Sequence, residues 1–278
     1  MTTSTWLITG ASSGLGYALA EYVLKQGDQV VLAARTVAPM AALATSFPDT
    51  ALAVELDVSD PQQRIGAVRQ AEGRFGAIDF LVNNAGIDFV GAVEEQDEAD
   101  YRKIFEVNFF GAVALLRLAL PSMRARGRGT IVNMSSMDGV ASLAVNGFYS
   151  ASKFALEGVT EALWQEIEPL GLRALLIEPG SFRTGIGERT KFSGQKIDDY
   201  AATSGVFRDA MANLGDHMFP GDPARAASAI FTALKSDFKA HRIILGADAY
   251  RNIGAKLQDL RADFEANREM AHSTDFKP

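Results

Sequence analysis

The 278-residue chain contains no cysteine, which excludes disulfide bonds, thiolate catalysis and metal sites built on cysteine. Its three histidines, His217, His241 and His272, are too widely spaced to predict a metal cluster. Long runs of lysine or arginine are also missing, and 27 basic residues face 34 acidic ones, for a net charge of −7. A nucleic-acid partner is therefore not expected.

Long apolar runs are missing as well. The longest, residues 107–120, contains Arg117 and ends at Pro121, so it is too short and too charged to span a bilayer. At the N-terminus an apolar run leads directly into glycines with no basic segment before it, and no signal peptide is predicted. We therefore expect a soluble, cytoplasmic protein without a membrane partner.

Short apolar runs alternate with helical patterns along the chain. Continuous apolar runs are typical of strands buried on both faces by helices, so the pattern predicts a Rossmann-type, doubly wound α/β fold with a parallel sheet. No glycine-, proline- or serine-rich linker divides the chain, and we expect a single domain over residues 1–278. The runs cover residues 6–8, 30–33, 51–56, 80–82, 130–133, 174–177 and 243–245.

Residues 185–221 break this alternation, because glycines and charges interrupt any sheet pattern. Long insertions in compact domains are usually functional. Tyr200, Phe207, Met211 and Leu214 recur within it at near-helical spacing. This spacing predicts a short amphipathic helix whose apolar face either covers a substrate site as a mobile lid or packs on the core.

A glycine-rich turn, from Thr9 to Gly16, follows the first predicted strand and opens a helix. Glycines permit the tight bend and let backbone N–H groups approach a pyrophosphate. The serines would add hydroxyl contacts to the phosphates or cap the helix. The expected contacts are Gly10, Ser12, Ser13, Gly14, Leu15 and Gly16.

Arg35 stands at the end of the second predicted strand. An NAD site would usually have an acidic side chain here to bind the ribose 2′-hydroxyl, whereas an arginine can pair with a 2′-phosphate. The sequence therefore predicts NADP(H), unless Arg35 is an ordinary surface charge. Asp28 cannot replace the acidic residue, because it precedes the strand and lies at its opposite end.

Tyr149 and Lys153 are four positions apart and share one face of a predicted helix. The ammonium can stabilise a phenolate beside it and shift the pKa of the phenol toward working pH. Such a pair occurs by chance in many helices. It becomes specific here because a nucleotide-binding turn precedes it.

In this order the motifs resemble those of the short-chain dehydrogenase/reductase family, and the resemblance covers nearly the whole chain. It implies an NADP(H)-dependent oxidoreductase that interconverts a ketone and a secondary alcohol by hydride transfer. Besides the glycine turn and the Tyr149/Lys153 pair, the motifs that carry it are Asp57-Val58, Asn83-Asn-Ala-Gly86, Asn108, Ser136 and Pro179-Gly-Ser-Phe-Arg-Thr184.

The resemblance implies four catalytic residues. Tyr149 would protonate the carbonyl oxygen during reduction and act as the base in reverse, while Ser136, favoured over Ser135, would hold and polarise the same oxygen. Lys153 would bind the nicotinamide ribose and lower the pKa of the tyrosine. Asn108 would hold a water that links Lys153 to bulk solvent.

Further cofactor contacts follow from the same resemblance. Asp57 and Val58 are expected at the adenine, although Asp57 has an alternative role as a helix cap. Pro179 and Gly180 would close the strand beneath the nicotinamide, and Thr184 would bind its carboxamide. The contacts expected at the adenosine ribose are Asn84, Ala85 and Gly86, with stabilisation of a turn as the alternative for the asparagines.

Candidate substrate contacts are Met137, Val145 and Phe148, beside the catalytic serine and tyrosine, and Phe207 and Met211 in the insertion. All five are apolar. We therefore expect a hydrophobic ketone or secondary alcohol.

Two helices bear on assembly. The helix over residues 101–120 and the one that carries Tyr149 have more apolar residues than a single core-facing stripe uses. In the family these helices form a two-fold interface, which implies a homodimer or homotetramer. An amphipathic helix over about residues 248–271 leaves the tetramer open, because it is long enough to cover the second interface.

Two other functions stay open from the sequence. A nucleotide-sugar epimerase or dehydratase would use the same tyrosine with a tightly held cofactor, but the G-x-x-x-G-x-G spacing of the turn disfavours it. A non-catalytic dinucleotide-sensing protein can dispense with the tyrosine or the lysine. This chain has both, together with Ser136 and Asn108.

Overall fold

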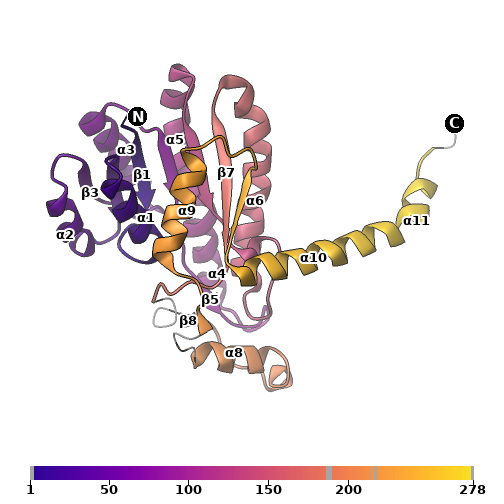
Figure 1. Cartoon of the computed structure of the whole chain (residues 1–278). Helices are drawn as coiled ribbons and strands as arrows, with labels where there is room; N and C mark the ends of the chain where they lie inside the picture. The colour runs from indigo at the N-terminus through magenta and orange to yellow at the C-terminus, as the bar shows by residue number, and fades with distance from the viewer. Residues whose placement is uncertain (1–2, 186–189, 214, 216–217, 277–278) are drawn as a thin grey trace.

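The computed structural model describes residues 3–185, 190–213, 215 and 218–276, and a parallel sheet forms its centre (Figure 1). Its strands are β1 (Thr5–Thr9), β2 (Gln29–Ala34), β3 (Ala51–Glu55), β4 (Phe80–Asn83), β6 (Thr130–Met134), β7 (Arg173–Pro179) and β9 (Arg242–Leu245). They pair in the order β3-β2-β1-β4-β6-β7-β9. The order reverses direction between β1 and β4, which is where doubly wound sheets form their ligand crevice. All seven predicted strands are confirmed.

Helices cover both faces of the sheet, as the doubly wound fold requires. Neighbouring residues of β1 point to opposite sides, so Ile8 packs into one buried cluster and Leu7 into the other. The first cluster includes residues of α1 (Gly14–Lys25), α2 (Ala38–Ser46) and α9 (Pro223–Leu234). The second includes residues of α3 (Pro61–Phe75), α5 (Gly111–Arg126) and α6 (Gly147–Ile167).

Asp28 stabilises the edge of the sheet opposite the glycine turn. Its carboxylate accepts hydrogen bonds from Trp6 Nε1 at 3.0 Å and from Lys235 Nζ at 2.9 Å. It also accepts one from the backbone N–H of Ser4 at 2.9 Å. Asp28 is thus a buried structural anion at the amino end of β2.

Helix α4 (Glu98–Phe105) continues through a π-helical turn, η1 (Glu106–Phe110), into α5. The resulting helix, Glu98–Arg126, has 29 residues and is long and apolar enough to cross a membrane by length and composition alone. The apolar run over residues 107–120, which alone is too short to span a bilayer, is therefore part of a longer helix. Leu115 and Met123, however, are fully buried against the sheet, as in a core helix.

The insertion forms a second, two-stranded sheet, in which β8 (Lys191–Phe192) pairs in parallel with β5 (Phe89–Val90). The sequence showed no pattern for β8, because a two-residue strand is too short to leave one. Helix α8 (Ser204–Ala212) lies beyond the carboxyl ends of the central strands (Figure 1). The ends of the insertion meet where Arg183 and Gly221 share a backbone hydrogen bond of 3.0 Å.

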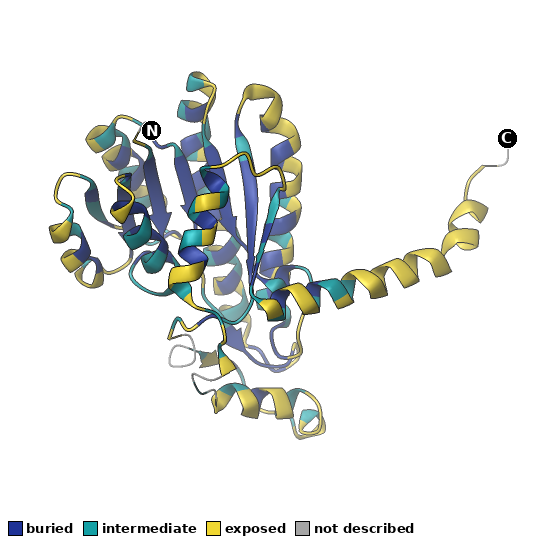
Figure 2. Ribbon diagram, in the orientation of Figure 1, coloured by how far each residue is buried: buried dark blue, intermediate teal, exposed yellow. Residues whose placement is uncertain are grey.

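The C-terminal helices α10 (Ala247–Ala266) and α11 (Arg268–Ser273) extend away from the domain (Figure 1). Ile253 is buried, Gly254 and Lys256 are half-buried, and from Leu257 onward the described residues of the helical arm are all exposed (Figure 2). Its apolar residues Leu257, Leu260 and Phe264 are among those exposed.

Candidate active site

The predicted catalytic residues meet at the carboxyl edge of the central sheet. Tyr149 and Lys153 lie one turn apart on α6, and Lys153 Nζ is 5.6 Å from the centroid of the Tyr149 ring. Ser136 follows β6, and its hydroxyl is close enough to Tyr149 for their hydrogen bond to lower the pKa of the phenol. Ser135, by contrast, acts on Glu157, whose pKa it lowers, and not on Tyr149. The structure therefore places Ser136, rather than its neighbour, beside the phenol.

The pKa of Tyr149 is raised above its ordinary value. Burial contributes most, the negative charges of Asp138 and Asp88 add to it, and the hydrogen bond to Ser136 only partly offsets them. This is the reverse of the expected lowering by Lys153. Tyr149 therefore stays protonated at neutral pH, which is the state of a proton donor.

The two acidic residues beside Tyr149 were missed in the sequence. Burial, and then the charge of Asp138, raise the pKa of Asp88 to about 7, while Phe89 and Lys153 act in the opposite direction. Burial likewise raises the pKa of Asp138. The only sequence signal was the position of Asp138 between the catalytic serine and tyrosine.

Lys153 and Asn108 are both buried. Burial lowers the pKa of Lys153 to about 8, and its Nζ donates a hydrogen bond to Met134 O at 2.7 Å. Asn108 lies on the π-helical turn, where its amide exchanges hydrogen bonds of 2.8 and 2.9 Å with the backbone of Ile87. A Cβ on Gly86 would lie 3.5 Å from Asn108 Oδ1 and 3.7 Å from Lys153 Nζ. Gly86 thus lies against both side chains, and the water relay stays a prediction.

The glycine turn has the geometry of an anion site. Gly10 and Gly14 have φ angles of +66° and +59°, in the left-handed region that favours glycine. Ser13 occupies the N-cap of α1, and the first turn of the helix contains no acidic residue. The helix N-terminus therefore presents backbone N–H groups and positive potential to an incoming phosphate. These residues fit a dinucleotide pyrophosphate.

Asn84 joins the end of β4 to this turn. Its Nδ2 donates to Thr9 O at 2.8 Å, and Thr9 Oγ1 accepts the backbone N–H groups of Asn84 and Ala85 at 2.9 and 3.0 Å. A Cβ on Gly16 would lie 2.3 Å from Asn84 Nδ2. The predicted alternative, in which Asn84 stabilises a turn, is therefore confirmed. A contact between Asn84 and the adenosine ribose would be additional to these bonds.

Arg35 is exposed at the carboxyl end of β2, near Asp57. Burial tends to raise the pKa of Asp57, but hydrogen bonds from Ser59 and the charge of Arg35 outweigh it and lower the pKa. The side chain that caps helix α3 is that of Asp60, so the alternative role of Asp57 as a helix cap was wrong. Val58 is 5% exposed, so its side chain belongs to the core.

The segment after β7 is held by a residue that the sequence did not indicate. The strand ends at Pro179, and a Cβ on Gly180 would lie 2.3 Å from Asp248 Oδ1. Asp248 also accepts the backbone N–H of Ser181 at 2.7 Å. Thr184 Oγ1 donates to the carbonyl of Phe182 at 3.3 Å, which positions it after the strand.

The three candidate substrate residues near the catalytic pair have different environments. Met137 is half-buried. Val145 is buried, with a φ of +67°, and its carbonyl accepts the backbone N–H of Gly91 at 3.0 Å. Phe148 stacks on Tyr101, with 4.3 Å between ring centroids. Val145 and Phe148 therefore help to pack the walls of the site, while Met137 and Phe148, both half-buried, retain accessible surface.

Helix α8 is anchored by a polar contact. Phe207 is 50% exposed, and Arg208 is the one buried residue of α8. The guanidinium of Arg208 lies 3.1 Å from Glu95 Oε2, and the two side chains are only 10% and 4% exposed. The alternative in which this face packs on the core is thus wrong for Phe207, and its role in a lid stays a prediction. Met211 is half-buried, and Leu214 lies outside the described residues.

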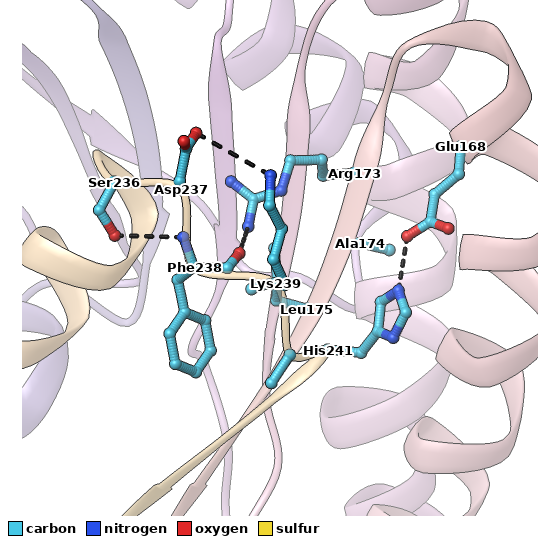
Figure 3. A pocket seen from close by; sticks show the side chains of 10 residues that line it. Glu168, Arg173, Ala174, Leu175, Ser236, Asp237, Phe238, Lys239 and His241 are labelled. Atoms are coloured by element: carbon cyan, nitrogen blue, oxygen red, sulfur yellow. Dashed lines mark hydrogen bonds and ion pairs between the residues drawn. The ribbon is translucent and has the colours of Figure 1, made fainter.

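A separate cavity opens at the opposite edge of the sheet, between the start of β7 and the loop before β9 (Figure 3). Its polar groups are internally paired: Arg173 Nη2 donates to Phe238 O at 2.8 Å, and His241 Nε2 pairs with Glu168 at 2.5 Å. It is not part of the catalytic edge. Within the described part of the chain no histidine and acidic side chains gather into a metal site, and His217 lies outside that part.

Comparisons with known proteins agree with this geometry. The short chain dehydrogenase family profile matches residues 4–193. A short-chain dehydrogenase from Streptomyces avermitilis has a similar structure, with a TM-score of 0.91 and 39% identity over 99% of this chain and 100% of that one. A Burkholderia phymatum member solved with NAD gives 0.81 and 25% identity, over 94% and 95% of the two chains. A 3-ketodihydrosphingosine reductase of Bacteroides thetaiotaomicron is 38% identical over 70% of this chain and 71% of its own. The chain belongs to the short-chain dehydrogenase family of oxidoreductases.

Proposed function

We propose that this protein is an NADP(H)-dependent carbonyl reductase that interconverts a hydrophobic ketone and a secondary alcohol. The observation that carries the proposal is the position of Tyr149 between Ser136 and Lys153, at the edge of the sheet where the glycine turn also lies. A carbonyl reduction produces an alkoxide, which needs a proton donor and hydrogen bonds where the charge develops. These three side chains supply both.

The residues around the glycine turn support a dinucleotide cofactor. The positive φ of Gly10 and Gly14 and the N-terminus of α1, whose first turn has no acidic residue, suit a pyrophosphate, and the related Burkholderia protein was solved with NAD. The exposed guanidinium of Arg35 supports the 2′-phosphate of NADP(H). When bound, NADPH supplies a hydride to the carbonyl carbon.

The side chains of this protein would manage the proton. Tyr149 donates its hydroxyl proton to the carbonyl oxygen, and Ser136 donates a hydrogen bond to the same atom. Because its pKa is raised, Tyr149 is protonated at neutral pH, which is the state that a proton donor in reduction requires. Lys153, with its Nζ beside the ring, would hold the nicotinamide ribose, and Asn108 would connect it to solvent.

The test is NADPH oxidation with a panel of aromatic and cyclic ketones, in the wild type and in Tyr149→Phe. Removing the proton donor should lower turnover by roughly 10²- to 10⁴-fold, while NADPH affinity, followed by fluorescence, should stay within about threefold. Tyr250→Phe is a matched control, because Tyr250 is 74% exposed on α10. Wild-type turnover in Tyr149→Phe would refute the mechanism. NADPH binding without turnover in the wild type would favour a sensor, and conversion without net NADPH consumption would favour an epimerase.

We further propose a cytoplasmic homodimer or homotetramer. Phe110, at the end of η1, and Phe154, on α6, are 51% and 45% exposed on the helices where the interface is expected. The apolar residues of the C-terminal arm add a second uncovered surface. Burial of these side chains in an interface would remove the cost of exposing them to water. A monomer mass by light scattering of a dilute solution would contradict this assembly.

A further inference from the structure

The helical arm carries an apolar stripe that continues a buried face of the same helix. At the base of α10, Ala249 and Ile253 are 0% and 3% exposed. Leu257, Leu260 and Phe264 follow at intervals of four, three and four residues, and they are 55%, 46% and 73% exposed. Because an α-helix turns by about 100° per residue, these three residues form a stripe within about 40° of Ile253 around the helix axis. The face that the domain covers at Ile253 is therefore uncovered beyond it (Figure 2).

An arm of this kind needs a partner to stay helical in water. Isolated helices shorter than about 12–15 residues are marginal, and most helices gain their stability by packing an apolar face. From Leu257 to Ala266 every residue of α10 is exposed, so this part does not pack on its own domain. Apolar residues that alternate at intervals of four and three are typical of coiled coils. The stripe therefore indicates a second helix as its partner.

The charges beside the stripe are complementary to a second copy of the same arm. Lys256 and Asp263 flank the stripe on the same side, seven residues apart. In an antiparallel pair with Leu257 against the partner's Leu260, Lys256 of each arm lies beside the partner's Asp263. A parallel pair would instead place Lys256 beside the partner's Arg261, and an antiparallel pair shifted by one heptad would place Asp263 beside the partner's Asp263. Of these three arrangements, only the first brings no like charges together.

We propose that the stripe pairs antiparallel with the same stripe of a second copy of this chain, with Leu257 of each arm against the partner's Leu260. This contact is separate from the surface at Phe110 and Phe154, and it does not depend on the reaction proposed above. It assigns a defined partner and register to the arm.

The end of α10 fits this register. Phe264 reaches the level of the partner's Ile253, at the base of the partner's α10. The helix breaks at Asn267, which ends α10 and precedes α11. In the proposed register Asn267 stands opposite the partner's Tyr250, just before the partner's domain begins. A straight helix that continued further would run into that domain, so the break falls where the arm has to turn aside.

A lipid surface suits the arm less well than a second helix does. Helices that bind membranes carry mainly lysine and arginine on their polar face. Between Lys256 and Glu269 the arm has three basic and four acidic residues, with the two signs interspersed. Such a pattern is typical of the exposed faces of paired helices. The charges therefore favour the second copy over anionic lipid.

The first test is the mass of the assembly, measured by analytical ultracentrifugation over a dilution series of the wild type and of Leu260→Asp. The substitution should raise the dissociation constant of the arm contact at least roughly 100-fold, because each pair loses two buried leucines. The mass should then halve at concentrations where the wild type is assembled. Ala262→Asp is the matched control, because Ala262 is exposed on the opposite side of the same helix and this variant should keep the wild-type mass.

The second test measures the orientation of the arms. Because the chain has no cysteine, Ala266→Cys gives a unique site for a nitroxide spin label at the exposed end of α10. In the proposed register the two labels lie about 15 residues apart along the pair, which is about 22 Å, whereas a parallel pair places them at the same level. Double electron–electron resonance distinguishes these separations.

Charge reversal provides an independent check of the register. Lys256→Asp should weaken the association roughly 10-fold, because it creates a like-charge contact twice in each pair. Adding Asp263→Lys to the same chain should restore the association to within about threefold of the wild type. A parallel pair would respond in the opposite sense, since Lys256→Asp would place an acid beside the partner's Arg261.

Equal masses of the wild type and Leu260→Asp at every concentration, or a monomeric wild type, would overturn the pairing of the arms. Label separations or charge responses of a parallel pair would overturn it as well. Binding to phosphatidylglycerol vesicles that is lost in Leu260→Asp, with no change of mass, would assign the stripe to a membrane instead. Failure of the wild type and of Leu260→Asp to reduce any ketone, with the mass difference intact, would refute the proposed function and leave the pairing standing.

Discussion

Substitution of Arg208 tests whether a single buried ion pair holds the insertion in place. In Arg208→Gln, Glu95 loses its cation but keeps backbone hydrogen bonds from Ala92 at 3.0 Å and Ile197 at 2.9 Å. Removing one partner of a buried pair costs about 3–5 kcal/mol, and the two retained donors place this case near 3 kcal/mol. Because a 1.4 kcal/mol change is tenfold, local opening should become roughly 150-fold more frequent.

Hydrogen exchange measured by mass spectrometry on peptides from residues 190–213 would show this change. The amides of that segment should exchange about 150-fold faster in Arg208→Gln, whereas the strands of the central sheet should keep wild-type protection, since opening is local. Lys196→Gln is the matched control, because the Lys196–Asp209 pair is 57% and 64% exposed and should contribute less than about 1 kcal/mol. Equal exchange in the Arg208 variant and the wild type, or an effect no larger than that of Lys196→Gln, would refute the anchoring argument.

Two further substitutions test the cofactor phosphate and the buried charge of the sheet. Arg35→Ala should weaken NADPH binding by roughly 10- to 100-fold, because a hydrogen bond to a charged group contributes about 1.5–3 kcal/mol, while NADH binding should stay within about twofold; equal losses in fluorescence titrations would contradict the phosphate contact. Burial, reinforced by the charge of Glu157, raises the pKa of Glu178 to about 7 despite Arg242. A pKa raised on folding means that Glu178 supports stability at low pH and that this support is lost as pH rises through about 7. Denaturant titrations should therefore show a gain for Glu178→Gln over wild type that grows from pH 5 to pH 8, and a constant difference would disprove it.

The sheet was predictable because its strands are buried on both faces and so leave continuous apolar runs, such as Val30 to Ala33 in β2. The catalytic positions were predictable because Tyr149 and Lys153 have a helical spacing and follow a glycine turn. Both signals are local, and each depends on a few neighbouring residues.

The remaining features depend on contacts between distant segments. Asp88 and Asp138 read as ordinary surface acids until the fold buries them beside the tyrosine. Arg208 anchors the insertion through Glu95, 113 positions away. Phe148, a candidate substrate contact, stacks on Tyr101 of another helix. Burial and pairing of this kind have no local pattern in a sequence.

The π-helical turn that carries Asn108 links the catalytic edge to the core in a way that limits how the chain can change. The i→i+5 hydrogen bonds of a π-turn accommodate one residue more than an α-turn does, so deleting one residue from Glu106–Phe110 would restore a regular α-helix and leave the rotation of α5 relative to α4 nearly unchanged. Leu115 and Met123 would then still face the sheet, and the change would fall on the turn that carries Asn108. A deletion here should therefore disturb the catalytic edge more than the core, whereas a deletion within α5 would turn the residues after it by about 100° and move Met123 away from the sheet.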